Sequence, residues 1–279
     1  MRWIIAPIIA AALAVGAQAE ERERTDAEPL VPYKIILVGD STMAPHSGWG
    51  GAFCAKHVKS SVACLNAGRG GRSTRSYRQE GSWDIALAEA KVPGYRAAYV
   101  LIQFGHNDQS SKPERWTEEK TEFPANLRDF VENVRAAGAT PVLVTPLTRR
   151  EFKDGQIRNT LASWSDEVRS VAKAMDVPLV DLNALSAAQV QKMGAETATQ
   201  LAQVPPNAEE LAAAKAGTTL PPRPAPPAPP AIEGDGPRGQ VTQKFDYTHL
   251  GDIGAEVTAR LVAQALAQAV PALRSQLVR

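Results

Sequence analysis

The chain has 279 residues, of which 44% are hydrophobic and 22% are charged, and its formal net charge at pH 7 is +1. This composition is typical of a soluble globular protein with an ordinary hydrophobic core. The near-neutral charge gives no reason to expect binding of nucleic acid or of an anionic membrane surface, so neither is expected as a partner.

The N-terminus has the pattern of a secretory signal peptide. A positive charge at Arg2 precedes an apolar run over residues 4–15, which is too short for an ordinary membrane span. Ala17-Gln18-Ala19 has the small residues that signal peptidase requires, and a charged stretch over residues 20–24 follows at once. We therefore expect residues 1–19 to be removed from a secreted or periplasmic protein; an uncleaved membrane anchor is the alternative.

Five short apolar runs rich in branched residues follow. Near-continuous apolar runs of this length are typical of parallel strands that are covered on both faces. They occupy residues 34–38, 62–66, 98–104, 141–145 and 178–181.

Apolar stripes at the spacing of an α-helix lie between these runs and after the last of them, and we expect them to face the core. The alternation of strands and helices predicts a three-layer α/β domain with right-handed crossovers. Gly138 is a natural helix end after the first stripe. The three stripes are Phe130, Val131, Val134 and Ala137; Trp164, Val168, Val171, Ala172 and Met175; and Val257, Leu261, Val262 and Leu266.

The two cysteines, Cys54 and Cys64, leave two alternatives open. An even number of cysteines in an exported protein favours a disulfide. Two small, buried, apolar side chains are the other interpretation. The sequence does not decide between them, because it does not show whether the two thiols meet.

A segment rich in Pro, Ala and Gly interrupts the pattern from Pro205 to Pro237 and holds about half of the 21 prolines. It lacks apolar periodicity and many backbone donors, so we expect an extended or mobile insertion at about residues 203–238. The residues after it contain a helical stripe but no sheet of their own. We therefore expect residues 20–279 to form a single domain that carries this insertion.

Polar motifs follow the predicted strands. Ligands of parallel α/β sheets bind beyond the carboxyl ends of the strands, so these loops are the candidates for a site. Gly39-Asp40-Ser41 follows the first run, a glycine-rich stretch over residues 66–73 follows the second, and Gly105-His106-Asn107-Asp108 follows the third. Asp246-Tyr247-Thr248-His249 lies near the C-terminus. Each motif alone could be an ordinary turn or helix cap, but together they supply the parts of an acyl-transfer site.

These parts have complementary chemistry. A serine hydroxyl such as that of Ser41 needs a base to take its proton, and histidine suits that task at neutral pH. The base needs a carboxylate to fix its tautomer, and Asp246 precedes His249 by a spacing that lets the two side chains meet. The oxyanion of the tetrahedral intermediate needs N–H donors, which a glycine amide, an asparagine side chain and the nucleophile's own amide can supply.

The motifs resemble those of the SGNH or GDSL hydrolase superfamily, which is named for its Ser, Gly, Asn and His blocks. More narrowly, the chain resembles the rhamnogalacturonan acetylesterases. The resemblance implies a three-layer α/β/α sandwich with a five-stranded parallel sheet in the flavodoxin-like order 2-1-3-4-5. The matching blocks occur in order over residues 38–44, 48–50, 71–77, 104–108 and 246–249.

The resemblance also implies the roles of individual residues. Ser41 is expected to be the nucleophile, and Asp246 and His249 complete the catalytic triad. The oxyanion hole is expected to consist of the main-chain N–H groups of Ser41 and Gly71 with the side-chain amide of Asn107. No metal and no cofactor is expected.

Further residues of the motifs receive secondary roles. Arg72, Arg75 and His106 are expected to contact the substrate, because arginine suits the carboxylates of a pectic backbone; structural or solvated arginines are the alternative. Asp40 and Asp108 are expected to hold loops in shape. The histidines do not have the spacing of metal ligands.

We therefore expect an O-acetylesterase that acts on an acetylated polysaccharide or oligosaccharide of the pectin or rhamnogalacturonan type. One alternative is a lipase or thioesterase of the same superfamily that takes longer acyl chains. A second alternative is a non-catalytic polysaccharide-binding protein, since a fold alone does not prove activity. The sequence does not predict the oligomeric state.

Overall fold

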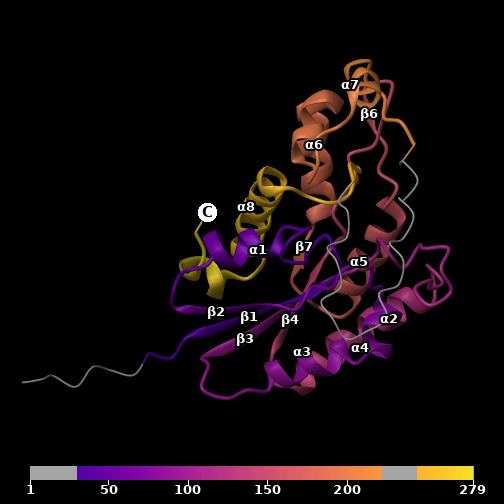
Figure 1. The fold of residues 1–279 in the computed structure, drawn as a ribbon. Coiled ribbons are helices and arrows are strands. Elements are labelled where there is room, and N and C mark those ends of the chain that lie inside the picture. The colour runs from indigo at the N-terminus through magenta and orange to yellow at the C-terminus, as the bar shows by residue number, and fades with distance from the viewer. Residues whose placement is uncertain (1–29, 222–243, 279) are drawn as a thin grey trace, which may run out of the picture. The chain divides into compact units, whose positions relative to one another are not determined.

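The computed structural model describes residues 30–221 and 244–278 (Figure 1). The expected signal peptide and residues 222–238 of the expected insertion therefore lie outside the described residues. The described residues from Val31 onward belong to one compact unit. None of the helices that the structure describes is long and apolar enough to cross a membrane.

Five parallel strands form the central sheet in the order β2-β1-β3-β4-β7. This order confirms the expected arrangement 2-1-3-4-5, and each strand lies where an apolar run predicts one. The last pair between β1 and β3 joins Gly39 to Gln103, so both strands end at the same level and their loops leave the same edge of the sheet. The strands are β1 (Tyr33–Gly39), β2 (Val62–Asn66), β3 (Ala97–Gln103), β4 (Thr140–Val144) and β7 (Leu179–Val180).

Successive residues of β1 face opposite sides of the sheet, as the two-residue period of a strand requires. Ile35 and Leu37 pack in one apolar core and Ile36 and Val38 in a second, and all four are fully buried. Figure 1 shows helices on both sides of the sheet, which confirms the three-layer architecture. The first core is covered by α1 (Gly50–Ala52), η1 (Phe53–His57), α8 (Asp252–Ala269) and η3 (Pro271–Gln276), and the second by α2 (Thr74–Gln79), α3 (Ser82–Ala90), α4 (Glu122–Ala136) and α5 (Ala162–Ala174).

The three predicted helical stripes lie in or next to α4, α5 and α8, and most of their side chains are buried. Phe130, Val131 and Val134 of α4 are each 0% exposed. Gly138 follows this helix with a φ of +76°, a conformation that glycine adopts at low cost because it has no Cβ. The helix end predicted at this glycine is therefore confirmed.

A third apolar cluster is built from segments that the sequence pattern does not reveal. Phe152, Val190, Ala198, Leu201 and Ala214 are its most buried members. These residues, and the partly buried Ile157 that packs against them, come from elements that are short or that lack a clear apolar stripe. These elements are β5 (Phe152–Lys153), β6 (Gln156–Ile157), α6 (Leu182–Ala198), η2 (Thr199–Leu201) and α7 (Ala208–Lys215).

Helix α7 corrects the expectation of an extended insertion, because it lies inside residues 203–238. The side chain of Asn207 accepts a hydrogen bond from Glu210 N (2.8 Å), and Glu210 Oε2 accepts one from Asn207 N (2.8 Å). This capping box satisfies amides at the start of the helix, and the alanine-rich sequence that follows has high helix propensity. The prediction of extended chain is therefore wrong for this part of the insertion.

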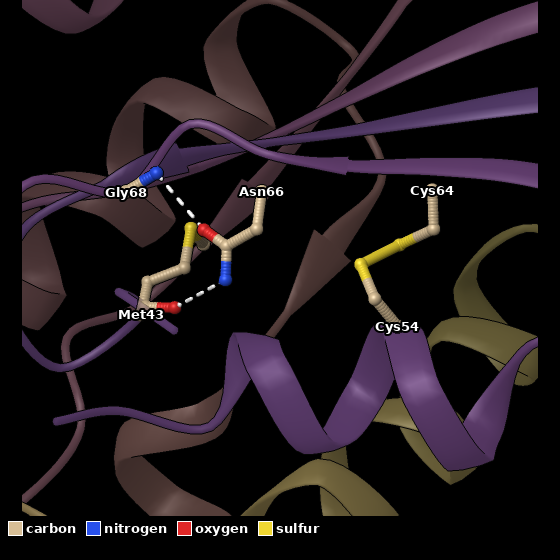
Figure 2. Close-up of a disulfide and its surroundings, with 5 residues drawn as sticks. All are labelled: Met43, Cys54, Cys64, Asn66 and Gly68. Atoms are coloured by element: carbon tan, nitrogen blue, oxygen red, sulfur yellow. Dashed lines mark hydrogen bonds between the residues drawn. A yellow bond between two sulfur atoms is a disulfide. The ribbon is translucent and has the colours of Figure 1, made fainter. Parts of the chain in front are cut away.

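Cys54 of η1 and Cys64 of β2 form a disulfide, with their Cα atoms 5.5 Å apart (Figure 2). Of the two alternatives that the sequence leaves open, the structure therefore has the disulfide and not two buried thiols. Two residues further along the chain, Asn66 donates from Nδ2 to Met43 O (2.9 Å) and accepts from Gly68 N (2.9 Å). The edge strand β2 is thereby attached both to the helical segment over the first core and to the loop that follows β1.

We expect the Cys54→Ala/Cys64→Ala double variant to lose about 2–3 kcal/mol of its free energy of unfolding, because the disulfide closes a loop between residues 10 positions apart. Urea unfolding of the two proteins measures this difference. The wild-type protein should lose the same amount when a reductant is added, whereas the double variant should not respond. Equal stability of the two proteins under oxidising conditions would contradict the expected contribution.

Candidate active site

The loop after β1 presents Ser41 at the carboxyl end of the sheet. Asp40 is fully buried, and its Oδ1 accepts hydrogen bonds from the main-chain N and the hydroxyl of Thr42, both at 2.8 Å. Its carbonyl oxygen accepts from the N–H groups of Met43 and Ala44. These bonds fold the chain into a tight turn. Asp40 thus holds the loop in shape, as expected, while Ser41 stays partly exposed.

Gly48 and Trp49 brace this turn from a second segment. A Cβ atom on Gly48 would lie 2.0 Å from the carbonyl carbon and oxygen of Thr42, so any larger residue would displace the Ser41 loop. Trp49 donates from its main-chain N to Thr42 O (3.0 Å) and from Nε1 to Gln103 Oε1 (2.9 Å). Gln103 in turn donates to the Thr42 hydroxyl (2.6 Å), which couples the loop to the end of β3.

The Ser41 hydroxyl meets His249, which lies 208 positions later in the chain. Ser41 Oγ is 2.9 Å from His249 Nε2, and His249 Nδ1 is 2.7 Å from Asp246 Oδ2. Asp246 Oδ1 accepts from the main-chain N of Thr248 (2.8 Å) and of His249 (2.7 Å). The structure therefore brings the serine, histidine and aspartate of the sequence motifs into one chain of hydrogen bonds.

The donors and acceptors in this chain of hydrogen bonds are arranged as nucleophilic acyl transfer requires. With a proton on Nδ1, the imidazole donates to Asp246 and can accept the Ser41 proton on Nε2. The side chain of His249 is 33% exposed and that of Asp246 is 21% exposed, so a substrate can reach the pair. Within residues 30–221 and 244–278, no group of three or more His, Cys, Asp or Glu side chains is placed to hold a metal ion.

The glycine-rich loop after β2 lies against Ser41. A Cβ atom added to Gly70 would be 3.7 Å from the Cβ of Ser41, and Gly71 has a φ of +77°, which favours glycine. Asn107, from the loop after β3, donates from Nδ2 to Arg72 O (3.1 Å). The two segments expected to supply oxyanion donors are therefore in contact with each other, and one of them borders the serine.

Asp108 fixes the loop that carries Asn107, and it is fully buried. Its Oδ1 accepts from the main-chain N (3.0 Å) and hydroxyl (2.6 Å) of Thr74 and from the hydroxyl of Thr117 (3.1 Å). Its Oδ2 accepts from Gly105 N (3.1 Å). These bonds join the loop after β3 to the start of α2, so Asp108 holds a loop in shape, as expected.

Both arginines that the sequence suggests for substrate binding are paired with carboxylates of the protein itself. Arg72 contacts Glu80 Oε2 through Nε and Nη2, each at 2.8 Å. Arg75 contacts both carboxylate oxygens of Glu122 through Nε and Nη2. A substrate carboxylate would have to compete with these partners, and binding of substrate by either arginine stays a prediction.

His106 is buried, with 7% of its surface exposed, and its Nδ1 lies 3.5 Å from Asp40 Oδ2. Burial lowers the pKa of His106, and the nearby charge of Asp40 offsets this only in part. Among the described residues, neither ring nitrogen of His106 has a hydrogen-bond partner. The pair brings the loops after β1 and β3 together, and a contact between His106 and substrate stays a prediction.

Two arginines near the site were not predicted from the sequence. The guanidinium of Arg115, in the loop after β3, lies 3.1–3.2 Å from where a Cβ atom of Gly71 would be. Arg150, in the loop after β4, donates from Nη2 to the main-chain carbonyls of Asp246 and His249, both at 2.9 Å. An isolated arginine forms no motif. The sequence feature that could have identified both residues is their position in loops that follow strands of the sheet.

The charge state of Asp246 follows from its contacts. Burial raises the pKa of its carboxyl group, but the hydrogen bond and charge of His249, together with the N–H donors of Thr248 and His249, lower the pKa to about 2. Asp246 is therefore a carboxylate at neutral pH and can stabilise a positive charge on the imidazole.

Sequence comparisons find relatives over most of the chain. A profile of the GDSL-like Lipase/Acylhydrolase family matches residues 37–209. The rhamnogalacturonan acetylesterase RhgT of Bacillus subtilis is 33% identical over 255 residues, which cover 88% of this chain and 95% of that protein. YesY, a probable rhamnogalacturonan acetylesterase of the same bacterium, is 31% identical over 58% of this chain and 76% of its own length. The rhamnogalacturonan acetylesterase of Emericella nidulans is 40% identical over 40% of this chain and 42% of its own length.

Solved structures share the fold. The Bacillus subtilis protein YxiM superposes with a TM-score of 0.61 at 22% identity, and the match covers 86% of this chain and 58% of that chain. A catalytic mutant of Axe2, an acetylxylan esterase from Geobacillus stearothermophilus, has a TM-score of 0.51 at 14% identity, with 86% and 96% of the two chains covered. At these identities the likeness shows the three-layer fold alone.

We expect Asp246 to stabilise the folded protein fully above about pH 4 and to lose this contribution as the pH falls toward about 2. The sign follows because the folded-state pKa lies below the ordinary value of about 3.9, so the unfolded chain binds the proton first. Urea unfolding of wild type and Asp246→Asn should show a stability difference of up to about 2 kcal/mol at about pH 5, shrinking toward about pH 2. A pH-independent difference would contradict the role of this charge.

Proposed function

This chain belongs to the GDSL-like Lipase/Acylhydrolase family, and we propose that it is an exported O-acetylesterase of acetylated pectic polysaccharides of the rhamnogalacturonan type. Membership of this family of acylhydrolases makes it a carboxylic-ester hydrolase. The proposal that the chain is a serine-dependent acetylesterase rests on the chain of hydrogen bonds from Ser41 through His249 to Asp246. The names of the relatives support acetylated polysaccharide as the substrate class.

In the proposed mechanism, His249 takes the proton of Ser41 while Ser41 Oγ attacks the acetyl carbonyl carbon. The bond between the acetyl carbon and the sugar oxygen then breaks while the imidazolium gives this proton to that oxygen, so the sugar leaves with a free hydroxyl and the acetyl group remains on Ser41. Water activated by His249 attacks the acetyl-serine, which releases acetate and restores the serine hydroxyl. Asp246 keeps the proton of the imidazole on Nδ1 and stabilises the imidazolium.

The proposed oxyanion donors are the main-chain N–H groups of Ser41 and Gly71 and the side-chain amide of Asn107. Asn107 gives one amide N–H to Arg72 O, and an asparagine amide has a second N–H that can point to the oxyanion. The same contact fixes the rotation of the Asn107 side chain, so the second donor is oriented before the substrate arrives.

Arg115 supports an acidic polysaccharide as the substrate. Its guanidinium lies against Gly71, in the loop that borders Ser41, and its side chain is 31% exposed. Its one ion pair among the described residues is a 4.0 Å contact with Glu114, which is itself 63% exposed. Arg115 is therefore free to bind a uronate carboxylate near the acetylated sugar, since a guanidinium matches a carboxylate through two parallel hydrogen bonds.

Trp116 adds an apolar surface next to this arginine in the chain. It is 47% exposed, whereas Trp49, Trp83 and Trp164 are buried in the two cores. An indole combines a large apolar face with a polar N–H, which suits contact with a sugar ring. We propose that Trp116 and Arg115 both belong to the surface that binds the polysaccharide.

Two independent features support export. The apolar run near the N-terminus and the motif Ala17-Gln18-Ala19 are typical of a signal peptide, which would leave residue 20 at the start of the mature protein. The disulfide between Cys54 and Cys64 is typical of proteins that fold in an oxidising compartment. We therefore propose a secreted or periplasmic location.

Ser41→Ala should lower the rate of p-nitrophenyl acetate hydrolysis by about 10⁴-fold or more, because the nucleophile is lost. Release of p-nitrophenol measures the rate, and Ser170→Ala, on the exposed face of α5, is the matched control that should keep it. A fluorophosphonate should label Ser41 of the wild-type protein, as mass spectrometry can detect. Hydrolysis at the wild-type rate by Ser41→Ala would overturn the mechanism, and no labelling would favour a non-catalytic polysaccharide-binding protein.

Two further measurements define the substrate. A series of p-nitrophenyl esters should show the fastest hydrolysis for acetyl, whereas a lipase or thioesterase would prefer longer acyl chains. Acetate release from a panel of acetylated polysaccharides should be fastest with rhamnogalacturonan, and faster release from xylan would reassign the substrate within the same mechanism.

Arg115→Ala should raise the KM for acetylated rhamnogalacturonan more than the KM for the same polysaccharide after its uronate carboxyl groups are reduced to alcohols. We expect the two effects to differ by about 10–100-fold, because a hydrogen-bonded charge contact contributes about 1.5–3 kcal/mol. Initial rates of acetate release measure both values. Arg128→Ala, an exposed arginine on α4, is the control. Equal effects of Arg115→Ala on the two substrates would rule out the carboxylate contact.

A further inference from the structure

The loop that carries Asp246 and His249 is held by one residue from a distant part of the chain. Arg150 donates from its main-chain N to Tyr247 O (2.8 Å). Its guanidinium donates from Nη1 to Thr248 O (3.3 Å) and from Nη2 to the carbonyl oxygens of Asp246 and His249, both at 2.9 Å. Four successive main-chain carbonyls therefore accept hydrogen bonds from Arg150.

The opposite side of the same loop is closed by Asp246 itself. Its Oδ1 accepts from the main-chain N–H groups of Thr248 and His249, which leaves Oδ2 for the imidazole of His249. With its carbonyls bound to Arg150 and its amides bound to Asp246, the loop cannot turn without breaking several bonds at once. The relative orientation of the carboxylate and the imidazole therefore depends on both sets of contacts.

Burial of the charged Arg150 side chain at this position costs free energy of desolvation. It is 3% exposed, its Nε has no hydrogen-bond partner, and none of the ion pairs among the described residues includes it. Burial lowers the pKa of its guanidinium to about 10, and the charge of Asp246 offsets this only in part. A buried cation held by carbonyl groups is weak evidence for a gain in stability, so another role must account for it.

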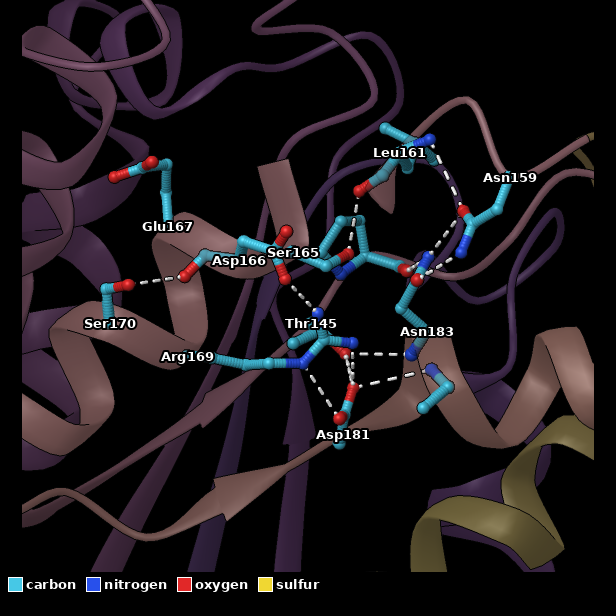
Figure 3. A network of polar contacts seen from close by, with 12 residues as sticks. Thr145, Asn159, Leu161, Ser165, Asp166, Glu167, Arg169, Ser170, Asp181 and Asn183 are labelled. Atoms are coloured by element: carbon cyan, nitrogen blue, oxygen red, sulfur yellow. Dashed lines mark hydrogen bonds and ion pairs between the residues drawn. The ribbon is translucent and has the colours of Figure 1, made fainter. Parts of the chain in front are cut away.

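The loop that carries Arg150 is fixed at its start. Figure 3 shows Thr145, directly after β4, in contact with Asp181 and Asn183. The Thr145 hydroxyl donates to Asp181 Oδ1 (3.0 Å) and accepts from Asn183 N (2.8 Å). Arg169 of α5 contacts the same carboxylate through Nε (2.9 Å) and Nη2 (2.8 Å). Arg150 is therefore presented by a loop that is anchored to the sheet and to two helices.

We propose that Arg150 is a positioning residue: it holds the main chain of residues 246–249 so that Asp246 and His249 keep the orientation that proton transfer from Ser41 requires. This inference rests on the function proposed above. Arg150 acts through the main chain and not on the reacting atoms. Its loss should therefore lower kcat and leave KM nearly unchanged.

Two variants test this role. Arg150→Lys keeps a cation but loses the planar fork of donors that reaches three carbonyls, and Arg150→Ala removes both. We expect kcat for p-nitrophenyl acetate to fall on the order of 10²-fold, with KM changed by less than about 3-fold. Arg135→Lys is the matched control, because Arg135 also donates from its guanidinium to two main-chain carbonyls, those of Met175 and Asp176. The control should keep the wild-type kcat.

Two further readouts separate positioning from stability. Guanidinium ion at a concentration too low to denature the protein should restore part of the kcat of Arg150→Ala per folded molecule, and it should not raise that of Arg135→Lys. Proton NMR of the wild-type protein should show a strongly deshielded resonance for the His249 Nδ1 proton, assigned by its absence in His249→Ala. This resonance should broaden or vanish in both Arg150 variants and remain in the control.

The inference is overturned if folded Arg150→Lys and Arg150→Ala keep the wild-type kcat and the NMR resonance. It is also overturned if the loss of activity equals the loss of folded protein measured by circular dichroism, or if neither variant folds, because Arg150 would then act on stability alone. A wild-type protein without esterase activity would instead refute the proposed function. The NMR resonance would still report whether Arg150 holds Asp246 against His249.

Discussion

The contact between Ser41 Oγ and His249 Nε2 joins residues 208 positions apart, and the rest of the site keeps these two atoms within 2.9 Å of each other. β1 and β3 end at the same level, which places the serine loop beside the loop that carries Asn107. Helix α8 follows His249 and packs in the same core as β1, so the second segment is attached to the same sheet. A hydrogen bond weakens steeply when its partners move, and the proposed proton transfer therefore depends on how firmly each loop is attached.

Buried polar side chains provide this attachment. Asp40, Asp108 and Arg150 are each at most 3% exposed, and the side chain of each binds at least one main-chain group of a loop that borders the site. Burial of apolar surface supplies most of the free energy of folding, but it has no preferred direction. Hydrogen bonds are directional and fix how a loop is rotated on the sheet. The apolar cores therefore stabilise the fold, and the buried polar residues orient the loops.

The sequence predicts those parts of the structure that depend on patterns among neighbouring residues. Apolar runs predict the five strands, and short motifs contain Ser41, Asn107 and His249 in the order that the site requires. Arg115 and Arg150 are single residues whose partners belong to distant loops, and no local pattern encodes such pairings. Helix α7 was not predicted for another reason. The many prolines around it made the whole segment resemble extended chain, although the segment contains a capping box and several alanines that favour a helix.

The order of the site segments along the chain determines when activity can begin during biosynthesis. The serine loop and both loops proposed to supply oxyanion donors leave the ribosome first, and the proposed base follows only with residues 246–249. Helix α8 comes later still, and its apolar face is needed to complete the core against β1. A nascent chain can therefore build most of its sheet before it contains the proposed base, and we expect no ester hydrolysis by the chain until residues 246–249 have been made.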